Sequence, residues 1–293
     1  MQSKTIKISV IIPTYNSEDY IERTLDTVFT QSVLPMEVVL VDDGSIDQTV
    51  NTVKNYMNVH LEASKRIQLI EQKNEGAGAA RNNGIRHANG NWIMFLDSDD
   101  LWEKDKIKVV IETIQKHPQI NVVTHNEYEV IGNYFENRHL IYRNRDYDET
   151  KDLFLQLYRG NMFSTSCMTI QKEIIDKVGK FDETLLSAQD YDLWIRVGLY
   201  GKVIYLEEPL ATYVIRRGNI TSNTYRRYLC EMKICKKYAN EVRKRIGERD
   251  AQKIIKARVL QIHKVEAYLA LKNKQIITFL KIVLNLLKVI FIK

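Results

Sequence analysis

Residues 92–100 read WIMFLDSDD, an apolar run that ends at three carboxylates. A short apolar run of this kind is typical of a central strand buried on both faces, so the acids follow where the strand leaves the sheet. Open α/β sheets bind their ligands at this end of their strands. Asp97 and Asp99 have the Asp-x-Asp spacing that supplies hard oxygen ligands for Mg²⁺ or Mn²⁺, and magnesium is commonly shared with substrate phosphates. The stretch therefore predicts a metal and a phosphate-bearing substrate at one edge of a sheet.

The same apolar rhythm recurs along the first 123 residues. Runs that read as strands alternate with helical patterns, and polar clusters follow the strands. The predicted strands cover residues 6–13, 37–41, 67–70, 92–96 and 120–123. Four helices are predicted between them: the first has Ser17 as its N-cap, the second follows Ser45 and ends at about Tyr56, and the others span 76–88 and 103–117. Strands and helices that alternate in this way form βαβ units. We therefore predict an α/β fold with a mostly parallel sheet that carries helices on both faces.

The pattern weakens after residue 123. Residues 124–150 have no clear period, and shorter elements are predicted beyond them: a helix over 151–158, a strand over 165–170, a helix over 189–200, and strands over 203–205 and 211–215. From residue 221 onward the chain reads as helical and basic. We therefore divide the chain into residues 1–123 and 124–220, two halves of one domain, and a C-terminal helical region, 221–293.

The composition limits the class of protein. The chain has 293 residues, of which 44% are hydrophobic and 27% charged, so it is globular rather than disordered. Its three cysteines lack C-x-x-C spacing, which argues against a disulfide framework or a structural zinc site and favours a reduced setting. The segment after Met1 does not read as a secretion signal. We therefore expect a cytoplasmic protein.

The C-terminal region is strongly basic and ends in an amphipathic segment. Residues 221–293 carry a net charge of +13 against +6 for the whole chain, which favours an anionic partner. Over residues 275–292 apolar side chains surround a narrow polar stripe made of Lys274, Thr278, Lys281, Asn285 and Lys288. Such a helix is too short and lysine-rich to span a bilayer comfortably, and it suits the bilayer interface with its lysines facing anionic headgroups.

Two other partners are considered for this segment: another protein surface and nucleic acid. Packing against its own domain, or against a sister subunit of a homo-oligomer, is the main alternative. Nucleic acid is disfavoured as a partner, because aromatic side chains are sparse and the apolar face is too wide for solvent.

Three polar loops follow predicted strands, and a parallel sheet brings them together. They are Thr14-Tyr15-Asn16, Asp42-Asp43-Gly44-Ser45 and Asp97-Ser98-Asp99-Asp100. A tyrosine can stack on a base, a carboxylate can accept a hydrogen bond from a ring N–H, and a metal can bridge a diphosphate. Taken alone, the second loop is more often turn and N-cap chemistry. Their coincidence at strand ends predicts a nucleotide-diphosphate pocket.

Two further segments are candidates for chemistry. Residues 76–81, GAGAAR, open a helix, but they follow the third strand and lack the third glycine of a dinucleotide fingerprint. Their N–H groups and Arg81 could favour a phosphate, and small residues for close helix packing are an equal alternative. Asp190 begins a predicted helix, where it is either a general base or an acid of the first turn. The six histidines show no metal-binding spacing.

Together these motifs resemble glycosyltransferase family 2. The resemblance covers residues 6–220 and rests on VIIPTYN (10–16), VDDGS (41–45) with Asp47 and Thr49, NEG (74–76) with AARN (79–82), and FLDSDD (95–100). It implies a GT-A fold and an inverting transferase that uses a nucleotide-diphosphate sugar, usually UDP-linked, with Mn²⁺ or Mg²⁺.

The resemblance also implies roles for single residues. Tyr15 and Asp43 would hold the base, Asp97 and Asp99 match the family's D-x-D with Asp99 as the direct metal ligand, and Asp190 matches the catalytic base. Further donor contacts are implied for Pro13, Thr14, Asn16, Gly76, Arg81 and Ser98. Two positions depart from the family: Gln189 replaces the Glu that precedes the base, and Arg216 or Arg217, before GNIT (218–221), takes the place of an Arg-x-His that would grip the diphosphate.

The predicted reaction is a single in-line displacement in which Asp190 deprotonates an acceptor hydroxyl. The basic tail would place the site beside a glycan or lipid-linked acceptor, so we expect surface polysaccharide or lipid-linked glycan assembly on the inner face of the plasma membrane. Two alternatives are a sugar-phosphate nucleotidyltransferase, for which no glycine-rich, lysine-bearing N-terminal loop is found, and a nucleotide-sugar-binding protein without catalysis.

Overall fold

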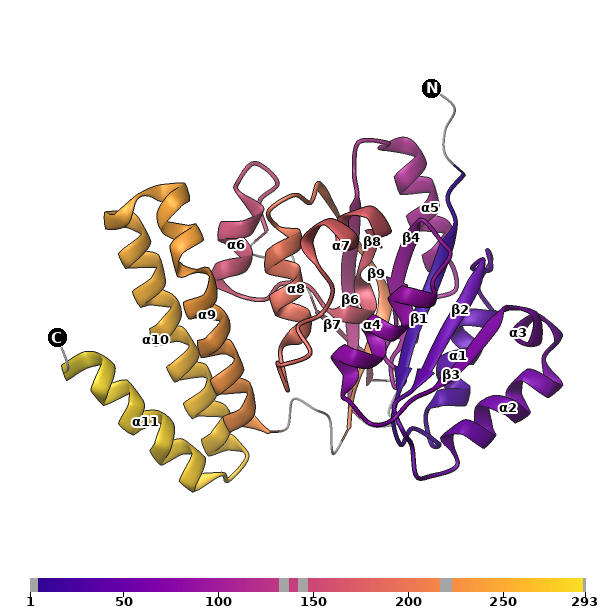
Figure 1. The fold of residues 1–293 in the computed structure, drawn as a ribbon, viewed down its shortest axis with the longest axis horizontal. Coiled ribbons are helices and arrows are strands. Elements are labelled where there is room, and N and C mark those ends of the chain that lie inside the picture. Colours follow the sequence, from indigo (N-terminus) through magenta and orange to yellow (C-terminus); the bar gives the residue numbers. More distant parts are fainter. Residues whose placement is uncertain (1–4, 132–136, 142–146, 217–222, 292–293) are drawn as a thin grey trace.

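The structure is a computed structural model that describes residues 5–131, 137–141, 147–216 and 223–291 (Figure 1). Four parallel strands form the N-terminal half of its sheet, in the order β3 (Ile67–Glu71), β2 (Glu37–Asp42), β1 (Ile8–Thr14) and β4 (Trp92–Phe95). The helices of this half are α1 (Ile21–Phe29), α2 (Thr49–Val59), α3 (Leu61–Arg66), α4 (Ala77–His87) and α5 (Lys106–Lys116). The predicted α/β fold is confirmed.

The strands are apolar throughout because both faces of the sheet are covered. Along β1, Val10 and Ile12 pack in a cluster with side chains of α1, α2 and α5, whereas Ile11 packs in a second cluster with α4 and α8 (Gln189–Val197). All three are fully buried. Burial of a side chain of this size stabilises the fold by about 1.5–3 kcal/mol. The N-terminal half is therefore a rigid base for the loops at its strand ends.

The sheet continues beyond β4 with strands of both directions. β8 (Thr169–Gln171) is antiparallel to β4, and β6 (Val122–Ile131) is antiparallel to β8 and parallel to β9 (Val203–Ile215). The short strands β5 (Leu101–Trp102) and β7 (His139–Ile141) pair with β9 and β6. Outside the sheet lie α6 (Leu153–Arg159), the 3₁₀ turn η3 (Thr165–Cys167), α7 (Lys172–Val178) and α8.

Strand β6 extends through residues 124–131, where the sequence shows no clear period. Its residues His125, Asn126 and Glu127 are polar and fully buried, which hides the strand pattern. They are tolerated because hydrogen-bond partners satisfy them: Lys106 Nζ lies 2.7 Å from His125 Nε2, and Asn126 Nδ2 donates to Glu207 O at 2.7 Å. Pairing with β6 also makes β9 one strand, not the two short ones predicted at 203–205 and 211–215.

Other local predictions were wrong at element ends. The strand predicted at 165–170 is η3 followed by β8, and the helix predicted to reach residue 200 ends at Val197. Ser17 is not an N-cap: α1 begins at Ile21, and the Ser17 hydroxyl lies 2.9 Å from Ser98 Oγ instead. Helices α3 and α7 were not predicted. Tertiary contacts decide these ends, which local sequence does not record.

The C-terminal region forms three helices, α9 (Thr224–Ile246), α10 (Glu248–Lys272) and α11 (Ile276–Phe291), as the basic helical pattern predicted. They lie on the side of α6 and α8, away from β1 to β3 (Figure 1). Buried side chains of α9 and α10 join the core cluster of α6 and α8. The three cysteines are buried thiols. In the part of the chain described, no helix has the length and apolarity needed to cross a membrane. Ile292, the last residue of the helix predicted over 275–292, lies outside the described residues. The assignment of separate roles to residues 1–123, 124–220 and 221–293 stays a prediction.

Candidate active site

One pocket of about 910 Å³ lies at the carboxyl ends of β1, β2 and β4. Its volume is in the range of pockets for small organic ligands. Every residue that the sequence assigned to the site lines it: Pro13, Thr14, Tyr15, Asn16, Asp43, Gly76, Arg81, Asp97, Ser98, Asp99, Asp190 and Arg216. Arg217 lies outside the described residues. The parallel sheet thus brings together loops that are distant in the chain, as predicted.

Asp43 organises one end of this pocket. Its Oδ1 accepts hydrogen bonds from Gln72 Nε2 and Glu75 N, and its Oδ2 accepts from Gly76 N, all at 2.8 Å. Gly76 has a φ of +94°, a conformation that a side chain would strain. A carboxylate offers about four acceptor positions, so one position on Oδ2 is left for a ligand. Nearby, Tyr15 remains 45% exposed, which leaves its ring open to a stacking partner.

The acids after β4 carry arginine partners. Arg81 Nη2 donates to Asp97 Oδ1 at 2.5 Å, and Arg216 Nε donates to Asp99 Oδ2 at 2.5 Å. The Arg216 guanidinium also lies over the Tyr20 ring, 4.5 Å from its centroid. The guanidinium groups are therefore the cationic partners of both D-x-D carboxylates in this structure.

Ser166 of η3 holds this acidic loop in place. Its hydroxyl donates to Asp100 Oδ2 at 2.5 Å and accepts from Asp97 N at 3.1 Å. Its carbonyl accepts from Lys106 Nζ at 2.6 Å and from Trp102 Nε1 at 3.0 Å. Lys106 is fully buried, and burial lowers its pKa to about 7. This network fixes the backbone from which Asp97 and Asp99 project.

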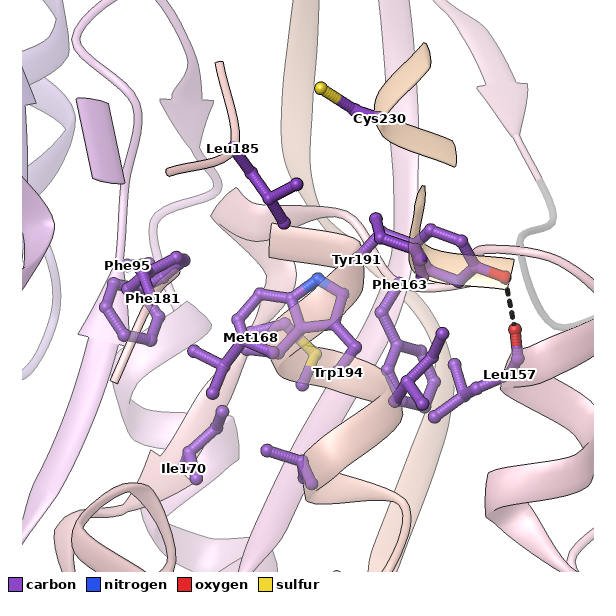
Figure 2. Close-up of a cluster of buried hydrophobic side chains, with 14 of the residues drawn as sticks. Phe95, Leu157, Phe163, Met168, Ile170, Phe181, Leu185, Tyr191, Trp194 and Cys230 are labelled. Atoms are coloured by element: carbon purple, nitrogen blue, oxygen red, sulfur yellow. Dashed lines mark hydrogen bonds between the residues drawn. The ribbon is translucent and has the colours of Figure 1, made fainter. Parts of the chain in front are cut away.

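Asp190 lies at the first turn of α8, on the same pocket. Its Oδ2 accepts from Thr165 Oγ1 at 3.2 Å, so neighbouring residues of η3 contact both the acidic loop and Asp190. The core beneath fixes the helix (Figure 2): Tyr191 donates its hydroxyl to Leu157 O at 2.8 Å, and the ring of Trp194 lies 6.0 Å from that of Phe95. Because Phe95 ends β4, the packing sets the position of Asp190 against the acidic loop.

Burial of several acids in one place changes their proton affinity. Burial raises the pKa of Asp99, repulsion from Asp97 adds to this, and Arg216 opposes it. Burial raises the pKa of Asp100 well above its usual range. Burial also raises the pKa of Asp190, against the attraction of Arg81. A cation or a proton is therefore favoured at this end of the pocket.

The residues present fit a divalent cation that is shared with a substrate. No group of three or more His, Cys, Asp and Glu side chains that could hold a metal is found in the described part of the chain, so a complete protein cage is absent there. Mg²⁺ and Mn²⁺ do not need one, since one or two carboxylates and substrate phosphates suffice. Asp97 and Asp99 provide that pair. The buried Thr14 hydroxyl, on the pocket wall, has no hydrogen-bond partner among the described residues.

The pocket also contains residues that the sequence did not single out. They include Asn161, Phe163, Thr165, Leu185, Leu186, Tyr213 and Arg226. Arg226 comes from α9, so the C-terminal helices contribute to the pocket. Ser98 lines the wall, but its hydroxyl contacts Ser17 rather than the carboxylates of Asp97 and Asp99. No local pattern marks Thr165 or Ser166, because their partners lie far away in the chain.

The fold and the pocket define a glycosyltransferase of the GT-A type, as solved structures show. The chain is similar to S. aureus TarS 1–349 in complex with UDP-GlcNAc, at a TM-score of 0.66 and 25% identity. The match covers 88% of this chain and 72% of that one. It also matches the mannosyltransferase PcManGT from Pyrobaculum calidifontis, in complex with GDP-Man and Mn²⁺, at a TM-score of 0.64 and 19% identity, over 93% of this chain and 74% of that one. At this lower identity the likeness concerns the fold alone.

The chain belongs to glycosyl transferase family 2, whose pattern matches residues 9–179. It is 32% identical to glycosyltransferase GlyA of Streptococcus pneumoniae serotype 4 over 224 residues, 73% of this chain and 31% of GlyA. It is also 32% identical to the amylovoran biosynthesis glycosyltransferase AmsB of Erwinia amylovora over 219 residues, 72% of this chain and 70% of AmsB. The chain thus spans about a third of GlyA.

Proposed function

We propose that this protein transfers a sugar from a UDP-sugar to an acceptor hydroxyl with inversion at the anomeric carbon. One observation carries the proposal: the short turn η3 forms hydrogen bonds both with Asp190 and with the acidic loop 97–100, so the two lie in one pocket. Thr165 contacts Asp190, and Ser166 contacts the loop of Asp97 and Asp99. This arrangement supports a base and a site for the departing diphosphate on either side of one reacting atom.

The donor would lie along the strand ends. Tyr15 stacks on the base, and the remaining acceptor position of Asp43 Oδ2 takes the ring N–H of uracil. Arg81 and Arg216 exchange part of their pairing with Asp97 and Asp99 for the diphosphate. Mn²⁺ or Mg²⁺ held by Asp99 and Asp97 would supply positive charge against the diphosphate as it leaves.

Asp190 acts as the base in this proposal. Its carboxylate takes the proton from the acceptor hydroxyl as the oxygen attacks the anomeric carbon and the bond to the nucleotide diphosphate breaks. A single displacement inverts the configuration. Burial raises the proton affinity of Asp190, which makes the ionised carboxylate a stronger base than an exposed aspartate.

We propose a glycan or lipid-linked acceptor and a role in surface polysaccharide assembly at the inner face of the plasma membrane. The name of AmsB, an amylovoran biosynthesis glycosyltransferase, supports the polysaccharide role. The net charge of +13 on residues 221–293 supports a location beside an anionic surface.

Isothermal titration with UDP, GDP, CDP and TDP, each with and without Mn²⁺, tests the donor class and the metal. We expect metal-dependent binding of UDP to the wild type and its loss in Asp99→Ala, while the exposed Asp176→Ala binds as the wild type does. UDP release from UDP-sugars in the presence of an acceptor then tests turnover. Failure of every nucleotide to bind with metal would overturn the proposal, and binding without turnover by any donor would indicate a binding protein.

A further inference from the structure

Helix α11 exposes an apolar face. The exposed fractions are 54% for Ile276, 72% for Ile277, 53% for Leu280, 58% for Leu284 and 43% for Leu287. At 100° per residue these five side chains fall within one third of the helix circumference. Exposed apolar residues are ordinary when scattered, but a continuous stripe marks an interaction surface. We call these five residues the α11 apolar face.

The opposite side of α11 is already occupied by its own domain. Ile282 is fully buried in the core cluster, and Phe279 packs against that cluster. The polar stripe is directed towards α9: Lys281 Nζ lies 5.2 Å from the centroid of the Tyr225 ring, and Asn285 lies beside Tyr228. Packing on its own domain, the alternative role for this segment, thus involves Ile282 and Phe279 and leaves the α11 apolar face exposed.

The charges around this face select its partner. After Glu266 the sequence contains lysines but no further acid. Lys272, Lys274 and Lys281 are exposed: Lys272 ends α10, Lys274 lies in the turn before α11, and Lys281 borders the α11 apolar face on the helical projection. A second copy docked symmetrically on this face would bring the same lysines together, which is repulsive. An anionic surface with an apolar interior satisfies both features.

We propose that the α11 apolar face inserts into the interface of an anionic lipid bilayer, with Lys272, Lys274 and Lys281 at the level of the headgroups. The helix lies in the plane of the membrane, and the domain stands above it on the side of Ile282. This surface is distinct from the sugar-transfer pocket and needs no catalysis to bind.

The position of α11 links this surface to the pocket. Tyr225, which contacts Lys281, precedes Arg226, which lines the pocket. The first turn of α9 thus has the membrane-facing helix on one side and the pocket on the other. If sugar transfer is the function, as proposed above, a lipid-linked acceptor reaches Asp190 along this first turn.

Vesicle sedimentation of the full chain without nucleotide tests the proposal. The wild type should bind vesicles of phosphatidylcholine mixed with phosphatidylglycerol and bind pure phosphatidylcholine more weakly. Ile277→Gln/Leu280→Gln/Leu284→Gln should bind the mixed vesicles about tenfold more weakly or worse, because apolar insertion is lost. Lys272→Gln/Lys274→Gln should lose about fivefold for each lysine on mixed vesicles only.

The matched control is Ile46→Gln/Val59→Gln/Leu61→Gln, three apolar residues with exposed fractions of 87%, 77% and 69% on the N-terminal half. It should bind vesicles as the wild type does, and thermal unfolding should show that all variants are folded. Wild-type protein that ignores both vesicles, or an α11 triple variant that binds normally, overturns the proposal. So does a wild-type dimer in sedimentation velocity that the α11 triple variant loses, since a second copy then covers the face. UDP titration of the same variants separates this outcome from failure of the donor site.

Discussion

The two ends of the pocket are held by different kinds of contact. At the base end, Asp43 accepts three hydrogen bonds from uncharged N–H groups of the chain. At the reaction end, Asp97 and Asp99 are paired with the cations Arg81 and Arg216. N–H groups of a loop are fixed by the fold, whereas long arginine side chains can turn to a new anion. The carboxylate at the base end is therefore part of the folded framework, whereas the arginines at the reaction end can exchange their carboxylate partners for the anionic groups of a substrate.

This difference predicts separate costs when each end is altered. A change at the base end should lower stability together with nucleotide affinity, since the same carboxylate does both tasks. A change at the reaction end should lower affinity or rate while the fold stays intact. Four substitutions test the contrast.

The largest effect is expected from Asp190→Asn. The amide has the same shape but cannot take a proton, so we expect kcat to fall about 10²–10⁴-fold. UDP affinity and the temperature of unfolding should stay near wild type. Stopped-time assays of UDP release under saturating donor and acceptor measure the rate. Asp176→Asn on α7 is the control, and a variant with near wild-type kcat would remove Asp190 from the mechanism.

Asp43→Asn should affect stability most. One side of the amide is an N–H₂ group, so it meets either the N–H of Gly76 or the N–H groups of Gln72 and Glu75 without an acceptor. We expect the free energy of unfolding to fall by about 1–3 kcal/mol, measured by urea titration, together with UDP affinity. The control is Glu71→Gln, which removes an exposed ion pair with Lys54 of 2.8 Å and should cost about 0–1 kcal/mol. Equal costs for the two would refute the structural role of Asp43.

Arg216→Gln should lower the affinity for the donor and leave the stability of the fold unchanged. Loss of a charged hydrogen bond to the diphosphate should weaken UDP binding about tenfold, measured by isothermal titration. Arg66→Gln removes the guanidinium of a peripheral ion pair with Glu62 and should leave UDP affinity unchanged. Wild-type affinity in Arg216→Gln would mean that Arg216 pairs with Asp99 in the donor complex as well.

The sequence predicted the base end and the acidic loop because their signals are local. Apolar β-branched runs followed directly by Tyr15, Asp43 or Asp97 place those side chains at strand ends wherever the strands are parallel. The resemblance to family 2 added Asp190, whose own neighbourhood in sequence gave it little advantage over an ordinary first-turn acid.

The rest depends on partners that lie far apart in the chain. Ser166 joins Asp100 and Lys106, which are about 60 residues away, and nothing near Ser166 marks that role. His125 is a buried polar residue in β6 that removes the alternation by which strands are found. For α11, amphipathicity was visible, but which side packs depends on Tyr225 and Tyr228 of α9.

The smallest effect is expected from Thr165→Val, which changes the acidity of the base while the carboxylate stays in place. The Thr165 hydroxyl donates to Asp190 Oδ2 at 3.2 Å and so favours the charged form, which opposes the rise in pKa caused by burial. Without the hydroxyl the pKa of Asp190 rises further. Because the base must be ionised, kcat/KM rises with pH through this pKa, and its acid limb should move to higher pH by up to about one unit. At a pH well above the pKa of Asp190 in both the wild type and the variant, the rate should stay close to that of the wild type.

Thr169→Val is the control, since that hydroxyl is buried without a hydrogen-bond partner in the described part of the chain. An unmoved acid limb, or a loss that is equal at every pH, would show that Thr165 positions Asp190 or merely packs beside it, and does not set its proton affinity.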